Sequence, residues 1–204
     1  PLEGVNATED PLEGVPEPEN NGCDNGGLSG NGPINLPADG DTLIPGTYCR
    51  DVRVNGGPVT FSPGVYIFDG ASLRVNAGAT VIALNVMIVF QDGSNSNNFQ
   101  ISAGSSWTQT APSSGTYEGI AFWSRDQNSY DISFTGQVDM NITGVIYAPE
   151  QDIKFAGGTS GGGSNAFIIA DEITFTGNTT IGSSFDPNEP PFFSNFLVVG
   201  NLVE

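Results

Sequence analysis

The sequence predicts an all-β protein, a single-domain right-handed β-helix (β-solenoid) with about 20–21 residues per coil. A short repeated phrase, its constant spacing and its alternating polarity predict this fold. The phrase has two apolar residues at i and i+2, then a small residue and a glycine, and its copies are Val52–Gly57, Leu73–Gly78, Ile132–Gly136, Ile153–Gly157 and Ile173–Gly177. Its second apolar residue advances from 54 to 75, from 134 to 155 and from 155 to 175, in steps of 21, 21 and 20 residues. Such short repeats are typical of stacked coils.

We expect roughly six or seven coils, each adding about 4.8 Å along the axis. The right hand is a general expectation for solenoids and is also what the family resemblance given below implies; it does not follow from the spacing.

Alternation puts the apolar residues of each phrase on one side of a strand and the residue between them on the other. The outward position is polar in every copy, with Arg53, Arg74, Ser133, Lys154 and Thr174. Three of the five basic residues of the chain share it. They form either a basic stripe that binds an anion or a solvated outer face that discourages edge pairing.

Composition narrows the class of protein. The 204 residues suffice for one domain, and 28 glycines, 14 prolines and only 14% charged residues fit short strands and tight corners. The apolar run over residues 80–90 is too short to span a bilayer as a helix, so no membrane span is expected.

The net charge of -18 disfavours nucleic acid and anionic membranes as partners, because both are negatively charged. Because histidine is absent, Ser-His-Asp catalysis and imidazole metal sites are excluded.

The two cysteines, Cys23 and Cys49, favour a disulfide, because two thiols without histidine make a poor zinc site. The bond would fasten the segment before the repeats to the first coil. The alternative is two reduced thiols that never meet. We expect any export signal to have been cleaved or to lie outside this sequence.

Residues 1–21 form an acidic, proline-containing N-terminal arm in which Pro1–Val5 is repeated as Pro11–Val15. Alone, such a segment is disordered or extended. Either its own solenoid or a neighbouring subunit must hold it, the latter by β-strand addition. The arm's candidate assembly residues are Leu2, Val5, Leu12 and Val15.

The β-helix is predicted over residues 22–184. It opens with a loop rich in Asn, Gly and Asp, where Asp24, Asp39 and Asp41 are weak candidate ligands for calcium. These oxygen-rich turns lack the complete spacing of a calcium loop, and turn formation is the alternative interpretation. No other metal and no organic cofactor is expected.

Two matched phrases, Pro45–Cys49 and Pro63–Gly70, mark corners before new strands. Together with Ser72–Asn76, Ala111–Ile120 and Gly144–Pro149, they make the region of about residues 23–182 resemble the extracellular region of tight-adherence (Tad) pilus-associated, TadG-like proteins. The resemblance implies an exported bacterial β-helical module at the cell surface, linked to pili or adhesion, with no catalytic residues to carry over. Those proteins carry an N-terminal membrane anchor where this chain has its acidic arm.

One step between rungs is longer than the others. Phe99–Gly104 has the form of a rung, and from Ile101 to Phe134 the spacing widens to 33 residues. The extra residues carry both tryptophans of the chain, Trp107 and Trp123, and two tyrosines, Tyr117 and Tyr130. Exposed on a loop, these rings would bind a surface polysaccharide or make an adhesive contact; alternatively, they cover the core.

Charged residues gather weakly at Arg125, Asp126, Glu150 and Asp152. Paired carboxylates hydrolyse glycosides when they converge on one groove. Because the acids outside the N-terminal arm are scattered, we expect no enzyme.

In the C-terminal segment, residues 185–204, the first seven residues (185–191) break the repeat and residues 192–203 are strongly apolar. Their candidate assembly residues are Phe192, Phe193, Phe196, Leu197, Val198 and Val199. The segment either caps the open edge of the solenoid or docks on the next subunit, so that coils stack head to tail.

These observations together predict a non-catalytic structural protein, extracellular or at the cell surface of a bacterium. It is expected to be a self-associating filament or pilus subunit or a pilus-associated adhesion component. A polysaccharide-binding module that uses the aromatic insertion is the alternative.

Overall fold

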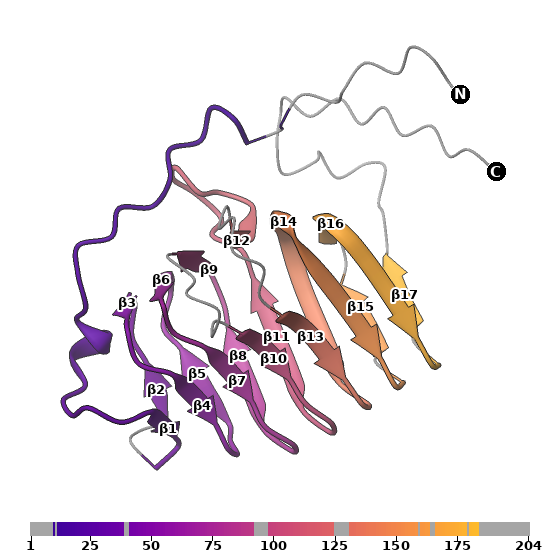
Figure 1. Ribbon diagram of the computed structural model, residues 1–204, viewed down its shortest axis with the longest axis horizontal. Helices are drawn as coiled ribbons and strands as arrows, with labels where there is room; N and C mark the ends of the chain where they lie inside the picture. Colours follow the sequence, from indigo (N-terminus) through magenta and orange to yellow (C-terminus); the bar gives the residue numbers. More distant parts are fainter. Residues whose placement is uncertain are drawn as a thin grey trace.

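A computed structural model describes residues 10, 12–38, 41–91, 98–124, 131–158, 160–163, 166–178 and 180–183. These residues form a β-solenoid of 17 strands with one short 3-10 helix (Figure 1). Every recorded strand pairing is parallel. The predicted all-β solenoid is therefore confirmed.

Each coil contributes a strand to each of three faces, in the chain order face 1, face 2, face 3. Face 1 contains β1 (Ile34–Leu36), β4 (Val52–Val54), β7 (Leu73–Val75), β10 (Asn98–Ile101) and β13 (Asp131–Thr135). Face 2 contains β2 (Thr42–Leu43), β5 (Val59–Phe61), β8 (Thr80–Ala83), β11 (Ser106–Thr110), β15 (Ser160–Gly163) and β17 (Thr180–Ser183). Face 3 contains β3 (Gly46–Tyr48), β6 (Gly64–Asp69), β9 (Val86–Gln91) and β12 (Ile120–Ser124).

Two long strands bend around the corners. β14 (Asp139–Ala156) runs through face 2, face 3 and face 1, and β16 (Ala166–Thr176) runs through face 3 and face 1. The register of this pair shifts between Ala148 and Asp152, where the chain turns from face 3 into face 1.

The register on face 1 confirms the predicted spacing. The paired residues are Ile34, Val52, Leu73, Phe99, Ile132, Ile153 and Ile173, which make seven rungs separated by 18, 21, 26, 33, 21 and 20 residues. The regular coils thus have the predicted length. The rung at Phe99 and the long step that follows it are also where the sequence placed them.

The interior is filled by apolar side chains stacked from coil to coil. Because successive coils are in register, like residues meet: the ring centroids of Phe68 and Phe90 are 5.1 Å apart, and Phe155 lies 5.0 Å from Phe134 and 5.3 Å from Phe175. Aromatic pairs at such distances contribute about 0.5–1.5 kcal/mol each beyond the area that they bury. The core is therefore continuous along the axis.

A disulfide-linked loop covers the edge of the first strand of face 3. The predicted Cys23–Cys49 bond is present and places the short helix η1 (Asn25–Gly27) beside β3. Asp24 accepts from the Thr47 amide at 3.0 Å, and Asn25 accepts from the Cys49 amide at 3.0 Å. Gly26 has φ +61°, and a Cβ there would collide with the Tyr48 ring, so only glycine fits. The loop satisfies amides that an open edge would leave unpaired.

Two buried tyrosines make stability sensitive to alkali. The Tyr48 hydroxyl donates to the Ile44 carbonyl at 2.5 Å, and the Tyr66 hydroxyl donates to the Ser62 carbonyl at 2.7 Å. Burial raises the pKa of both hydroxyls well above the ordinary 10.0. Above pH 10 the unfolded chain therefore loses protons that the folded chain keeps, and the free energy of unfolding falls as pH rises.

Above pH 10 we expect Tyr66→Phe to reduce the decline of the free energy of unfolding with pH by up to about 1.4 kcal/mol per pH unit, which is the contribution of one proton. Urea unfolding midpoints between pH 8 and 11.5 measure it. The exposed-loop variant Ser114→Ala is the control and should follow the wild type. Identical slopes for Tyr66→Phe and wild type would contradict the prediction.

Candidate functional site

The outward sides of the three faces differ in chemistry. Face 2 presents mainly hydroxyl and amide side chains, including Thr42, Thr60 and Asn141, all exposed. Face 1 presents the polar row that the sequence predicted. Face 3 presents apolar residues outward, so it is the face that needs a cover.

The outer apolar cluster of face 3 is separate from the interior core. Its buried members are Ile67, Met87, Val89, Ile120, Trp123, Val145 and Tyr147 from the solenoid and Leu12 from the arm. Phe167 and Ile169 of β16 pack against it and are partly buried. Burying both sides of a strand requires a continuous apolar run, and Val86–Phe90 is such a run, with all five residues buried. This pattern was the available signal for a covered outer face.

The N-terminal arm supplies the cover. Tyr147 of β14 donates to Asp10 at 2.7 Å, Gln91 of β9 donates to the Pro18 carbonyl at 2.9 Å, and Asn20 donates to Asp69 of β6 at 2.9 Å. The arm then reaches β3 through Cys23. It therefore crosses the coils in the reverse of chain order, along one side of the solenoid (Figure 1).

Leu12 is the apolar anchor of the arm. Its side chain is 1% exposed and lies in the outer cluster. A turn presents it: the Leu12 amide donates to Asp10 Oδ1 at 2.9 Å, and the Val15 amide donates to the Leu12 carbonyl at 3.0 Å. Of the two predicted ways to order the arm, the protein's own solenoid holds the described part. Leu2 and Val5 lie outside the described residues.

We expect Leu12→Asp to detach the arm, because burying a leucine contributes about 1.5–3 kcal/mol and a carboxylate cannot replace it in an apolar site. The global free energy of unfolding should fall by no more than the docking free energy, since the arm can open locally. Cleavage by a glutamate-specific protease after Glu13 and Glu19 should accelerate at least tenfold. Val15→Thr, at the partly buried neighbour, should show a smaller change, and equal cleavage rates in wild type and Leu12→Asp would refute arm docking.

The two tryptophans of the aromatic insertion are not exposed. Trp107 lies on β11 inside the core, Trp123 lies on β12 in the outer cluster, and both are 0% exposed. The expectation that these two tryptophans are exposed is therefore wrong, and their burial favours the alternative in which the rings pack on the protein's own core. Tyr117 is partly buried against the outer cluster, and Tyr130 lies outside the described residues.

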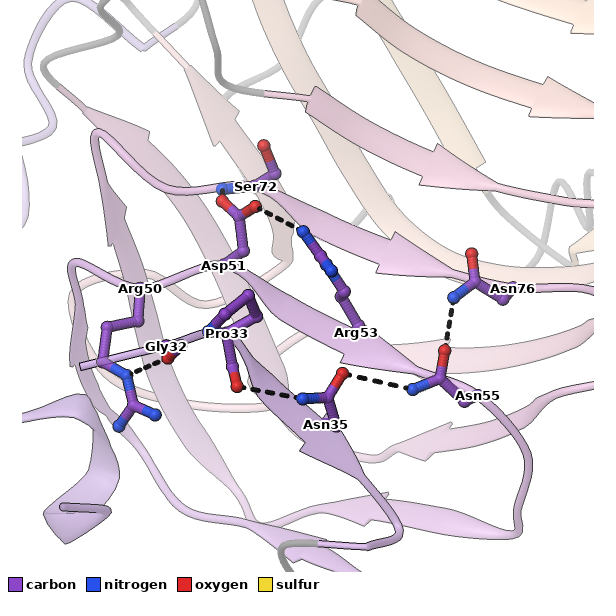
Figure 2. Close-up of polar contacts among 9 residues, drawn as sticks. All are labelled: Gly32, Pro33, Asn35, Arg50, Asp51, Arg53, Asn55, Ser72 and Asn76. Carbon is purple, nitrogen blue, oxygen red and sulfur yellow. Dashed lines mark hydrogen bonds and ion pairs between the residues drawn. The ribbon is translucent and has the colours of Figure 1, made fainter. Parts of the chain in front are cut away.

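The polar row of face 1 ties neighbouring coils together (Figure 2). Asp51 accepts from the Ser72 amide at 3.1 Å and lies 3.5 Å from the Arg53 guanidinium. A ladder of amides runs beside them: Asn76 donates to Asn55 at 2.5 Å, and Asn55 donates to Asn35 at 3.5 Å.

The basic residues of face 1 form an interrupted row. Arg53 and Arg74 are register partners, but Gln100 and Ser133 separate them from Lys154. The geometry supports a solvated, coil-linking face better than a continuous basic stripe.

The acidic candidates have local partners where they are described. Asp24 caps η1 and accepts from the Gly26 and Thr47 amides, both at 3.0 Å, and Asp41 accepts from the Thr42 hydroxyl at 3.2 Å. The Cys23 and Cys49 sulfurs lie within 4.8 Å of an Asp69 oxygen, but the disulfide occupies both sulfurs. Asp39 lies outside the described residues, so calcium binding stays a prediction.

The remaining candidates have different environments. Glu150 and Asp152 are exposed at the corner between face 3 and face 1, and the intervening Gln151 is buried. Arg125 and Asp126 lie outside the described residues. The C-terminal assembly candidates also lie outside them: Phe192, Phe193, Phe196, Leu197, Val198 and Val199.

Comparisons with family models, curated proteins and solved structures find no match for this chain. Within the part of the chain that the structure describes, no helix is long and apolar enough to cross a membrane. The disulfide is consistent with an oxidising environment.

Proposed function

We propose that this chain is a non-catalytic structural protein of the bacterial cell surface, which acts by self-association or as a pilus-associated attachment component. The TadG-like motifs of the sequence and the disulfide support an exported location. The structural observation that carries the proposal is the use of polar side chains as links between coils.

These links recur on all three faces. Asp24 binds the Thr47 amide, Asp51 binds the Ser72 amide, and Ser105 donates to the Asn76 carbonyl at 2.8 Å. Gln109 donates to the Val86 carbonyl of the preceding coil at 3.1 Å and to the Ala121 carbonyl at 2.7 Å. Hydrogen bonds of this kind fix coils against one another and favour a rigid rod. A rod held together in this way suits a load-bearing or spacing role.

Two measurements, one of cellular location and one of self-association, test the proposal together. Antibodies against the purified chain, used in immunogold microscopy of the intact producing bacteria and of fibres sheared from them, should label the surface or the fibres. Light scattering and negative-stain microscopy of the purified protein test self-association. Label confined to the cell interior, together with a compact monomer at all concentrations, would overturn the proposal.

A further inference from the structure

Face 2 presents a regular array of small side chains to solvent. Five strands of this face, β2, β5, β8, β11 and β14, are paired in parallel register, and each coil contributes two outward residues at i and i+2. The first column, in register order, is Thr42, Thr60, Ile82, Thr108 and Asn141. The second column, two residues further along in each coil, is Ile44, Ser62, Leu84, Thr110 and Thr143. We call these ten residues the face 2 array; none of them is buried.

The array combines hydroxyl groups with exposed apolar groups and carries no ionisable side chain. Its aliphatic members, Ile44, Ile82 and Leu84, are 48%, 37% and 45% exposed. Among the described residues, the other exposed large apolar side chains are Ile173 and Phe175 of the last rung. Exposed apolar surface is thus concentrated on face 2, and the same face lacks charge in a chain whose net charge is -18. Asp139 precedes the array by two positions, at the start of β14.

The array is held rigid from inside and from coil to coil. Val59, Val81 and Trp107, on the inward side of the same strands, are 0% exposed. The Thr110 hydroxyl accepts from the Asn85 amide of the preceding coil at 2.8 Å. Most members of the array are threonine or isoleucine, whose branched side chains have restricted χ1 angles. A ligand that contacts all the positions at once would therefore order few side chains.

The spacing of the array determines what it fits. Neighbouring strands lie about 4.8 Å apart and residues i and i+2 of one strand about 6.8 Å apart, so the outward side chains occupy a nearly rectangular lattice. These two repeats are comparable to the repeats of the oxygen atoms on a prism face of ice. Hydroxyl groups can take the place of water in such a lattice, and methyl groups can lie between its water molecules. An ionised group would interrupt the lattice, because it keeps its own hydration shell.

Two other occupants fit the array less well. It measures about 24 Å by 14 Å, roughly 300 Å², whereas each partner of a stable protein pair buries about 800 Å². A second copy of the chain would therefore need more surface than the array offers. Small-molecule and sugar sites are usually concave and contain aromatic side chains, and the array is one side of a sheet without any aromatic residue.

We propose that face 2 binds ice, through water molecules that the hydroxyl and methyl groups of the array hold at lattice positions. Protein adsorbed in this way stops the growth of the ice surface where it is bound and lowers the freezing point below the melting point. The charged remainder of the molecule stays in liquid water. The inference goes beyond the proposed function and does not rest on it, because the cellular location of the chain does not enter the argument.

Ice growth in solutions of the purified full chain, with its disulfide intact, tests the inference. The wild type should shape single ice crystals and produce a thermal hysteresis, the gap between melting and freezing points. Thr60→Lys, inside the array, should reduce this hysteresis at least about tenfold, because the ammonium group retains its hydration water. Thr135→Lys is the matched control: it lies on β13 of face 1, makes the same change in side chain and net charge, and should keep the wild-type hysteresis. Circular dichroism should show the same fold in all three proteins.

Several results would overturn the inference. One is a wild type that neither shapes ice nor produces hysteresis, and another is equal hysteresis in the wild type and Thr60→Lys. Sedimentation velocity and binding to crystalline cellulose, measured on the same three proteins, identify the other occupants. A dimer that Thr60→Lys alone dissociates, without ice activity, would assign face 2 to a second copy. Cellulose binding that Thr60→Lys alone abolishes, again without ice activity, would assign it to a polysaccharide.

Discussion

Trp107→Ala should lower the free energy of unfolding by about 3–5 kcal/mol, the range for removal of a fully buried large aromatic side chain. The indole is 0% exposed and lies edge-on to two rings, with centroids 5.8 Å from Phe61 and 5.5 Å from Phe99. The contact with Phe99 joins face 2 to face 1 across the interior, and the contact with Phe61 joins two strands of face 2. Since the surrounding strands are fixed by their ladders, they can close the cavity only in part.

A hydrogen-bond relay adds to this loss. Trp107 Nε1 donates to Gln109 Oε1 at 3.1 Å, and Gln109 Nε2 donates to the carbonyls of Val86 and Ala121. Without the indole, the amide oxygen of Gln109 keeps its buried position but loses this donor, at a cost of about 1–3 kcal/mol. We therefore expect the variant to lie at the upper end of the range.

Urea unfolding followed by circular dichroism measures the effect. Trp107→Phe should recover part of the loss because it refills the cavity without restoring the hydrogen bond. Thr108→Ala, the outward neighbour on the same strand, should stay within about 0.5 kcal/mol of wild type. A Trp107→Ala protein of unchanged stability would contradict the burial and restore the interpretation of this ring as a ligand contact.

Removing the disulfide should have the next largest effect. The bond closes a loop between residues separated by 26 positions, and chain entropy predicts that its loss destabilises the folded state by about 3.5 kcal/mol. The double variant Cys23→Ser with Cys49→Ser should show this loss, and wild type under reducing conditions should match it. Without the tether, Asp24 and Asn25 lose the proximity that lets them cap β3.

Amide hydrogen exchange identifies the strands that the loss of the disulfide destabilises. Protection of the Thr47 and Cys49 amides should fall most, while the amides of β13 and β14 should change little. Ser29→Ala, in the same loop, is the matched control and should keep both stability and protection. A double variant as stable as wild type would mean that the loop holds the edge without its covalent link.

The inward pattern of the coils was predictable from sequence because it is local. Pairs such as Ile132/Phe134 and Ile153/Phe155 face one interior, and their spacing equals the length of a regular coil. The disulfide followed from simple cysteine counting. Periodicity of this kind needs no knowledge of which distant segments meet.

The cover on face 3 could not be predicted in the same way. The Tyr147 and Asp10 side chains that meet there are separated by 137 positions, and nothing in the acidic arm specifies a partner. Trp123 was misassigned for a related reason: a bulge in β12 breaks the pairing register between Ile120 and Phe122, which hides the alternation that would mark an outward position. Its side chain points outward, and the arm and its neighbours in the outer cluster bury it.

The arm also changes how the solenoid should come apart. In a stack of coils each coil contacts only its neighbours, so unfolding can proceed by stepwise loss of coils from an end. Here the arm bonds to β14, β9 and β6 and is linked covalently to β3, which joins coils that do not touch one another. Loss of a central coil must therefore also release contacts made several coils away. While it is docked, the arm therefore couples the stabilities of coils that do not contact one another.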